Sequence, residues 1–218
     1  MATSIVPEQS SSKPIGYIRE DFYKHCLFTQ VTTQEEYDEV LHLRHEAYSL
    51  AKKIPSHKTL ADMADEFDAR SIILIAKYED AIVGSVRVIK HNETDLLSYG
   101  RYFESPPSEL PPRKDYVEAS RMCVHPNFNG LGIFYHLAIR MVLATIDSDK
   151  RYIVGGSTKE LLLKWENCGF RTIGVKYSSK DINAIEHELI VLDTNEVVQG
   201  QGISPKVREH LARLLNRH

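Results

Sequence analysis

The chain has 218 residues, a hydrophobic fraction of 42% and a formal net charge of −3, with 27 basic residues against 30 acidic ones. These values are typical of an ordinary globular domain, and the balance of charge excludes a nucleic-acid binder that works through bulk electrostatics. The first residues lack a charged segment followed by an apolar core, and no apolar run is long enough to span a bilayer, so we expect a cytoplasmic protein without an integral membrane segment.

Residues 1–15 are rich in Ser, Pro and polar groups, which predicts a disordered tail ahead of one domain over 16–218. A first strand is expected over 24–31. Thr33 and Glu36 form a capping-box signature, and the apolar residues that follow repeat at helical spacing as far as Ala51. A polar loop with one helical turn near 60–64 then leads into two largely buried strands, 71–78 and 81–90.

A long connection over 91–114 precedes a strand at 116–125, and Pro126 ends that strand. A helix to about Ser148, a strand at 152–156 and a helix that starts at Ser157 or Thr158 come next. Two strands, 171–177 and 187–193, and a C-terminal helix after Pro205 complete the chain. This order predicts an α/β or α+β architecture in which helices pack on a mixed sheet.

Charged side chains interrupt segments that otherwise appear buried. Arg44 lies on the apolar stripe of the first helix, Arg87 lies inside the second buried strand, and the strand at 116–125 carries Glu118, Ser120 and Arg121. A buried charge is costly unless it is paired, so these positions indicate a site or an ion-pair network. In a regular strand Glu118 and Arg121 face opposite sides, so both reach one site only if the strand contains a bulge.

The turn after this strand, Asn129 to Gly132, is the best local candidate for a ligand site. Backbone N–H groups around Asn129, Gly130, Leu131 and Gly132 can point at one place, and the following helix adds its positive end, so a phosphate or pyrophosphate is a natural ligand. An ordinary strand-to-helix turn is the alternative.

These residues resemble the GNAT acyltransferase superfamily. The resemblance covers about 31–177 and rests on Val124 and Pro126, on Asn129, Gly132 and Phe134, and on the later segment Trp165, Glu166, Gly169 and Phe170. It implies a mixed, mainly antiparallel central sheet with helices on both faces. It also implies an acyl thioester co-substrate, acyl-ACP or acyl-CoA, with no tightly bound cofactor and no metal. The donor site that it implies comprises Val124, Asn129, Gly130, Leu131, Gly132 and Ile133. Asn129, Phe134 and Trp165 depart from the pattern of a conventional acetyl-CoA enzyme.

The charged residues resemble those of one branch, the N-acyl amino acid synthases and the acyl-homoserine lactone synthases. The matching set, in chain order, is Arg44 with Tyr48, Asp65 with Asp68, Arg87, and Glu118 with Ser120 and Arg121. The resemblance implies an N-acyltransferase that moves a medium or long acyl chain to the amine of an amino acid or derivative. An acyl-homoserine lactone synthase, a small-group acetyltransferase and a non-catalytic acyl-CoA or lipid-binding module are the alternatives.

The expected mechanism is direct attack of the amine on the thioester carbonyl. Glu118, helped by Ser120 and Arg121, is the candidate base, and backbone N–H groups near Met122 to Val124 are expected to stabilise the oxyanion. A purely structural role for Glu118, as anchor of Arg44 and Arg87, remains equally open.

The small-molecule amine is expected to meet Arg44, Tyr48, Asp65, Asp68, Arg87, Met122 and Trp165. Six apolar residues are candidates for an acyl slot, with core packing as the alternative: Met122, Ile139, Val142, Val154, Leu162 and Trp165. Four basic residues are candidates for contact with an acyl carrier protein: Arg140, Lys150, Arg151 and Lys164.

Overall fold

A computed structural model describes residues 22, 25–90, 98–179 and 184–215, so the predicted tail over 1–15 lies outside the described residues. The strands form one seven-stranded sheet in the order β1-β2-β3-β4-β5-β7-β6. The strands are β1 (Cys26–Gln30), β2 (Ser71–Tyr78), β3 (Ala81–Ile89), β4 (Tyr116–Val124), β5 (Tyr152–Ser157), β6 (Arg171–Ser179) and β7 (Ile185–Asp193). Only β4 and β5 pair in parallel among these neighbours, which confirms the predicted mixed, mainly antiparallel sheet.

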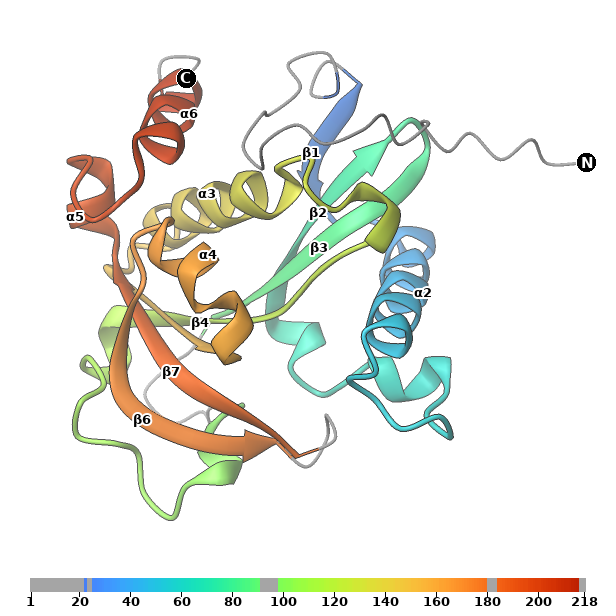
Figure 1. The fold of residues 1–218 in the computed structure, drawn as a ribbon, viewed down its shortest axis with the longest axis horizontal. Helices are drawn as coiled ribbons and strands as arrows, with labels where there is room; N and C mark the ends of the chain where they lie inside the picture. The colour runs from blue at the N-terminus through green and yellow to red at the C-terminus, as the bar shows by residue number, and fades with distance from the viewer. Residues whose placement is uncertain (1–21, 23–24, 91–97, 180–183, 216–218) are drawn as a thin grey trace, which may run out of the picture.

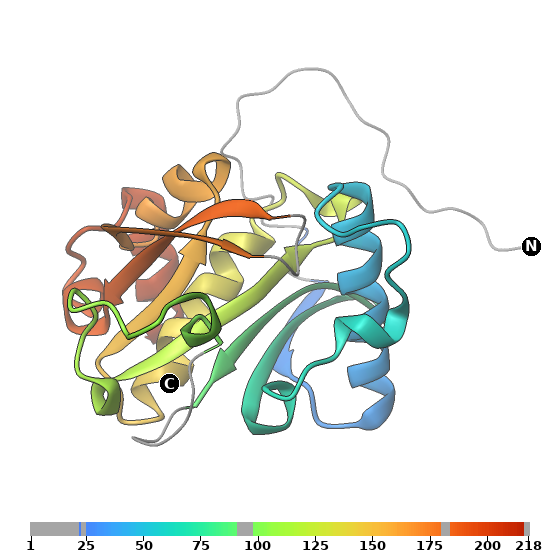
Figure 2. The same cartoon turned by 90° about the horizontal axis from the view of Figure 1, so that it is seen from below.

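Helices cover both faces of the sheet, as predicted (Figure 1). The helices are α2 (Gln34–Leu50), α3 (Ile133–Ile146), α4 (Leu162–Glu166), α5 (Thr194–Val198) and α6 (Pro205–Leu215). Figure 2, seen from below, places α2 on one side of the strands and α3 on the other. The short helix α5 was not predicted, because five residues are too few to reveal a helical period.

The first helix forms where its signature predicts, with one difference at the cap. The Thr33 side chain accepts a hydrogen bond from the backbone N–H of Glu36 at 3.2 Å. The Glu36 carboxylate accepts at 2.8 Å from the backbone N–H of Thr32 rather than from that of Thr33. Both bonds satisfy N–H groups at the start of the helix, so α2 begins at a fixed point and presents a fixed face to the sheet.

Two apolar layers fix the sheet between the helices. On the α3 side Val86, Leu137 and Ile153 are fully buried, and on the α2 side Val40 and Ile75 are fully buried. Helix α3 approaches β3 so closely that a Cβ atom at Gly84 would lie 2.7 Å from the Ile133 side chain. The sheet is therefore held rigidly on both sides of β3 and β4, the strands that carry the site.

Candidate active site

The parallel strands β4 and β5 separate partway along their length. The first four residues of β4, Tyr116 to Ala119, pair with β5 residues Tyr152 to Gly155, and the pairing of the two strands ends there. The last five residues of β4 and the last two of β5 lie beyond this point. A wedge-shaped opening thus forms within the sheet, and groups from both strands become available to a ligand.

A cavity of about 180 Å³ occupies this region, and its walls come from α2 and α4, from the loops after α2, β3 and α4, and from β3 to β7. Its walls are Tyr48, Lys53, Asp65, Val86, Arg87, Ser98, Tyr99, Arg101, Tyr102, Ala119, Ser120, Arg121, Met122, Gly155, Gly156, Trp165, Phe170, Tyr177, His187 and Ile190. Seven of the predicted site residues are among them: Tyr48, Asp65, Arg87, Ser120, Arg121, Met122 and Trp165.

A β-bulge in β4 turns Arg121 toward the same face of the sheet as Ser120. Ser85 of β3 is paired with Cys123, and Arg87 is paired with Ser120, so two residues of β4 stand opposite Val86 alone. Arg121 has a φ of 56°, a left-handed conformation that only a few per cent of non-glycine residues adopt. The structure therefore contains the bulge without which Arg121 would face the opposite side of the sheet from Ser120.

The buried guanidinium of Arg44 forms a two-pronged salt bridge with Asp68. Its Nη1 and Nη2 atoms donate to the two Asp68 oxygens at 2.9 and 3.1 Å, and Nη1 also donates to the Met63 carbonyl at 3.1 Å. The Tyr37 hydroxyl donates to Asp68 at 2.9 Å. Burial opposes ionisation of Asp68, but the bonds and charges of Arg44 and Arg87 outweigh it and lower the pKa of this carboxyl to about 2. Asp68 is therefore ionised at neutral pH.

Arg87 and Arg121 extend this network to the cavity wall. Arg87 donates from Nε to the Ser120 hydroxyl at 2.9 Å and from Nη1 to Asp68 at 3.1 Å, with a further short contact to Asp65. Arg121 Nη2 donates to Asp65 at 3.0 Å. Three arginines with two aspartates sum to a net charge of +1. Lys53 and Arg101 add cations to the wall itself, so the cavity favours an anionic ligand group.

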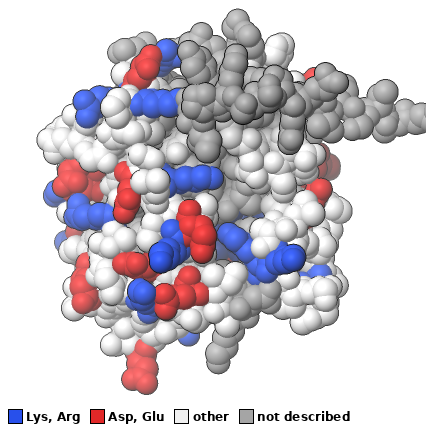
Figure 3. Space-filling model, in the orientation of Figure 1, with Lys and Arg blue, Asp and Glu red and all other residues white. Residues whose placement is uncertain are grey.

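Figure 3 shows basic side chains near the middle of the face in view, with acidic side chains lying among them.

Glu118 is fully buried and lies outside the set of cavity-wall residues. Its Oε2 atom accepts a hydrogen bond from the backbone N–H of Ser98 at 3.0 Å. The neighbouring Tyr99 hydroxyl donates to the Ala119 carbonyl, so β4 holds the start of the 98–103 segment by two bonds. The carboxylates that bind Arg44 and Arg87 through hydrogen bonds are Asp65 and Asp68.

Aromatic rings form the wall opposite the arginines, and the sequence did not reveal this wall. Tyr177 of β6 is stacked on Tyr102, with ring centroids 5.2 Å apart, and on His187 of β7, at 5.4 Å. A Cβ atom at Gly156 would lie 2.0 Å from the Tyr177 hydroxyl oxygen, so any larger residue at this position of β5 would displace the Tyr177 ring. The aromatic content of the 91–114 connection was the only local signal, because β6 and β7 join the site through tertiary pairing.

The predicted donor turn lies at the start of α3, beside the cavity rather than in its wall. Two of its predicted N–H donors are used inside the turn, because Asn129 N–H donates to the Pro126 carbonyl at 3.1 Å and Leu131 N–H donates to the Phe128 carbonyl at 3.4 Å. Gly130 and Gly132 have φ values of 81° and 87°, which other residues reach only with strain. Gly132 is the residue before α3, and the helix's backbone bonding begins with the N–H of His136 donating to its carbonyl. The N–H groups of Ile133 to Tyr135 therefore point out of the first turn, an arrangement that binds anions.

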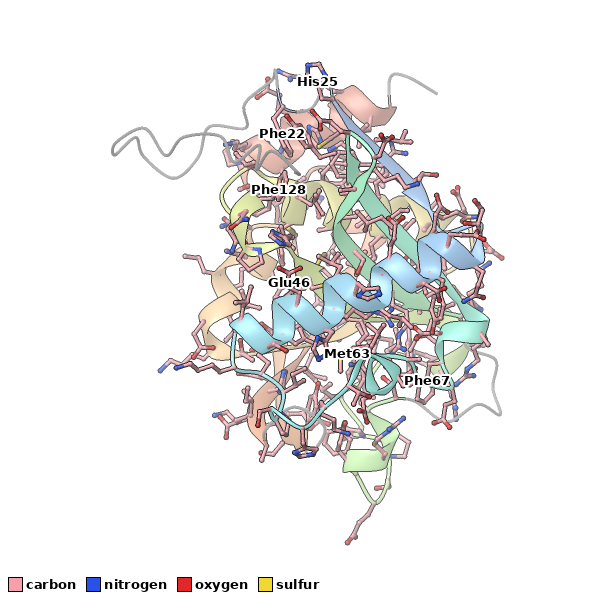
Figure 4. All side chains as sticks on the ribbon, turned by 90° about the vertical axis from the view of Figure 1, so that its right-hand side faces the viewer. Phe22, His25, Glu46, Met63, Phe67 and Phe128 are labelled. Carbon is pink, nitrogen blue, oxygen red and sulfur yellow. The ribbon has the colours of Figure 1, made fainter. Side chains whose placement is uncertain are left out.

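Side chains from three parts of the chain hold this turn. The His125 Nδ1 atom accepts from the backbone N–H of Asn127 at 3.2 Å, so this histidine caps the turn, and its Nε2 lies 3.2 Å from Glu46 of α2. Phe128 packs near Phe22, with centroids 6.1 Å apart. Figure 4 shows Phe22 and Phe128 on one side of α2, with Met63 and Phe67 from the following loop on the other.

Phe134 links the turn to the cavity wall. Its ring contacts Trp165 with centroids 4.6 Å apart, and the Lys164 Nζ atom lies 5.7 Å from the centroid of Phe134. This places a cation near the first turn of α3.

The predicted acyl-slot and carrier-contact residues divide between different places. Met122 and Trp165 line the cavity, whereas Ile139, Val142 and Val154 are buried in the core, and Leu162 packs against it. Arg151 binds Asp193 at 2.7 Å and Lys150 donates to the Lys114 carbonyl, both next to the start of β5 and away from the opening. Lys164 is next to the donor turn. The core interpretation is therefore correct for Ile139, Val142 and Val154.

Residues 43–138 match the family model described as "Acetyltransferase (GNAT) domain". No curated protein matches the sequence. One similar solved structure is FeeM, an N-acyl amino acid synthase from uncultured soil microbes, with 10% identity, a TM-score of 0.63, and coverage of 81% of this chain and 94% of that one.

Two further similar structures have the same fold at low identity. ElaA from Escherichia coli has 13% identity and a TM-score of 0.56, and the alignment covers 77% of this chain and 99% of that one. An acyl-CoA N-acyltransferase from Pseudomonas aeruginosa has 16% identity and a TM-score of 0.55, with coverage of 77% and 98%. Within the described part of the chain, no helix combines the length and apolar character needed to cross a membrane.

Proposed function

We propose that this chain, whose residues 43–138 match the GNAT acetyltransferase domain model, transfers a medium or long acyl group from a thioester to the amine of an amino acid or derivative. The donor in this proposal is an acyl-CoA or an acyl-carrier-protein thioester. The similar fold of FeeM, an N-acyl amino acid synthase, supports an amino acid as the proposed acceptor.

The observation that carries the proposal is the opening between β4 and β5 next to a cationic cavity. A linear donor arm fits between diverging strands, because their unpaired backbone groups offer hydrogen bonds there. An amino acid brings a carboxylate, and the four cations of the wall, Lys53, Arg87, Arg101 and Arg121, outnumber its one carboxylate, Asp65. The cavity is thus electrostatically suited to an anionic acceptor.

In this proposal the donor's phosphate groups lie on the turn from Asn129 to Ile133. The N–H groups at the start of α3 receive the negative charge, and Lys164 adds a cation beside them. Val124 ends the strand that leads into this turn. The acyl chain passes Met122 and Trp165, the two predicted slot residues that line the cavity.

The bulge supplies the oxyanion site. Two residues of β4 face one residue of β3, so the ladder is irregular there, and the N–H groups near Met122 to Val124 are the proposed donors to the thioester carbonyl oxygen. Ser120 accepts from Arg87, and Arg121 binds Asp65. Both interactions fix the bulge against the arginine network.

Arg44, Asp68 and Tyr48 support the site from α2 and its loop. The salt bridge of Arg44 with Asp68 holds the loop that carries Asp65, and Tyr48 contributes a ring to the cavity wall. Glu118 is the base predicted from the sequence, and it reaches the amine only through a water molecule because it lies behind the wall. Its bond to Ser98 equally supports a positioning role for the 98–103 segment.

An acyl carrier protein is the proposed partner if the donor is not a CoA ester. Carrier proteins of this class are acidic, and Lys164 is the predicted contact that lies beside the donor turn. Replacement of Lys164 by Glu is expected to raise KM for acyl-ACP more than KM for acyl-CoA.

Mass spectrometry of lipid extracts tests the function. Cells that express the protein are expected to accumulate N-acylated amino acids, and cells that express Arg121→Met are expected to contain little. Accumulation of acyl-homoserine lactones or of N-acetylated amines would reassign the acceptor or the donor. Unchanged extracts from wild-type cells would count against acyl transfer, and retained acyl-CoA binding would then favour a binding module.

A further inference from the structure

His187 of β7 is the one histidine in the wall of the cavity. Its ring lies flat against Tyr177, with an angle of 24° between the planes, and only 9% of the residue is exposed. Stacking and burial therefore hold the ring in one orientation, which a proton-transfer group requires.

One hydrogen bond fixes which nitrogen of this ring carries the proton. The Nδ1 atom lies 2.8 Å from the carbonyl oxygen of Ile185. A carbonyl oxygen only accepts, so Nδ1 is the protonated nitrogen and donates this bond. In the neutral ring Nε2 then carries a lone pair and acts as a proton acceptor.

The surroundings keep the ring neutral at pH 7. Burial is the largest cause and lowers the pKa of His187 below its usual 6.5. The bond to Ile185 opposes this effect without outweighing it, the cation of Lys53, in the loop after α2, adds to the lowering, and the carboxylate of Glu160 has the smallest, opposite effect. Tyr177 of β6 covers one face of the ring.

We infer that His187 is the general base of the reaction and accepts, through Nε2, a proton from the ammonium group of the acceptor. This inference rests on the proposed function. Glu118 is fully buried outside the cavity wall, whereas His187 is part of that wall. A base must reach the amine directly or through one water, and a residue in the cavity wall satisfies this condition more readily than a buried residue outside it.

The step balances without a further reactant. The ammonium loses one proton to His187 Nε2, and the free amine forms a C–N bond with the thioester carbonyl carbon. The C–S bond then breaks as the tetrahedral intermediate collapses, and the departing thiolate takes the second proton of the attacking nitrogen. His187 returns its proton to solvent through the open side of the cavity.

His187→Gln tests the inference, because an amide of similar reach cannot accept a proton at neutral pH. We expect kcat at pH 7 to fall by about 100-fold, with KM for the thioester donor unchanged. The loss should shrink as pH rises toward the pKa of the acceptor amine, because free amine then needs no base, and added imidazole should restore part of the rate. His45→Gln is the matched control, since His45 lies on α2 and contacts the Lys58 carbonyl outside the cavity. It should keep the wild-type rate.

A variant within twofold of wild type, or a loss that is the same at every pH, would overturn the assignment of His187 while leaving the acyl transfer intact. Wild-type protein that forms no N-acylated amine would instead refute the proposed function. Long-range ¹H–¹⁵N correlation spectra of the wild-type protein show independently which nitrogen of the His187 ring carries the proton. A neutral ring protonated on Nδ1 at pH 7 is expected, and a ring protonated on Nε2 would exclude the role whatever the activity.

Discussion

Removal of the Asp68 charge tests the ion network on which the cavity depends. In Asp68→Asn the side chain keeps its size, but the fully buried Arg44 loses its carboxylate partner. The pKa of Asp68 falls from 3.8 to about 2, and each pKa unit corresponds to 1.36 kcal/mol, so the native charge interactions stabilise the fold by roughly 2 to 3 kcal/mol at neutral pH. The variant also leaves a buried cation unpaired, and breaking such a pair costs about 3 to 5 kcal/mol. We expect a loss near 3 kcal/mol.

Urea denaturation at pH 7 measures this loss through the fluorescence of Trp165, the single tryptophan, which is buried beside the cavity. Asp62→Asn is the control, because Asp62 lies in the same loop and binds Lys58 at the exposed surface. Its midpoint should stay near that of wild type. In the wild type the contribution of Asp68 should be complete above pH 3.8 and should vanish as pH falls through about 2. Equal midpoints for Asp68→Asn and Asp62→Asn would refute the reasoning.

Three further predictions address the cavity wall, the C-terminal packing and the donor turn. Gly156→Ala should destabilise the protein by about 1 to 3 kcal/mol in the same urea assay, because its Cβ would overlap the Tyr177 hydroxyl. Gly155→Ala is the control, since its Cβ would meet only ordinary contacts at 3.5 Å or more. Similar urea midpoints for the two variants would contradict this prediction. Burial, with electrostatic repulsion from His210 and Arg140, lowers the pKa of His136 to about 2, so the stability it contributes is present above pH 6.5 and is lost as pH falls from 6.5 toward that value. His136→Gln should flatten a plot of melting temperature against pH between 6.5 and 5, and an unchanged slope would exclude this cause. Gly132→Ala should raise KM for acyl-CoA at least severalfold with little change in KM for the amine, because alanine is strained at a φ of 87°. Equal effects on the two KM values would argue against a donor-binding role for this turn.

The strands and long helices were predictable because their periodicity is local. The bulge at Arg121 was predictable only as a condition. Successive side chains of a strand alternate between its two faces, so Glu118 and Arg121 share a face only if the strand is irregular. The carboxylate partner of Arg44, Asp68, was also foreseeable, because a buried guanidinium requires an anion and the loop at 62–68 is rich in aspartate.

The aromatic wall was not predictable from local pattern. Tyr177 and His187 reach the cavity only because β7 is inserted between β5 and β6, and no spacing in the sequence encodes that pairing. Lys53 was overlooked for a similar reason, since a lysine at a helix end is ordinarily solvated and its place in the wall follows from tertiary packing. The bond between Glu118 and Ser98 likewise joins residues that are 20 positions apart, so local pattern does not reveal it.

The central claim is acyl transfer from a thioester to the amine of an amino acid. Purified wild-type protein, incubated with a long-chain acyl-CoA or acyl-ACP and a mixture of amino acids, tests it most directly by high-resolution mass spectrometry. The account predicts a product whose mass is that of the fatty acid plus one amino acid minus water, formed in equal amount to the free thiol released. Thiol release with only free fatty acid, or no product with either donor, would contradict it.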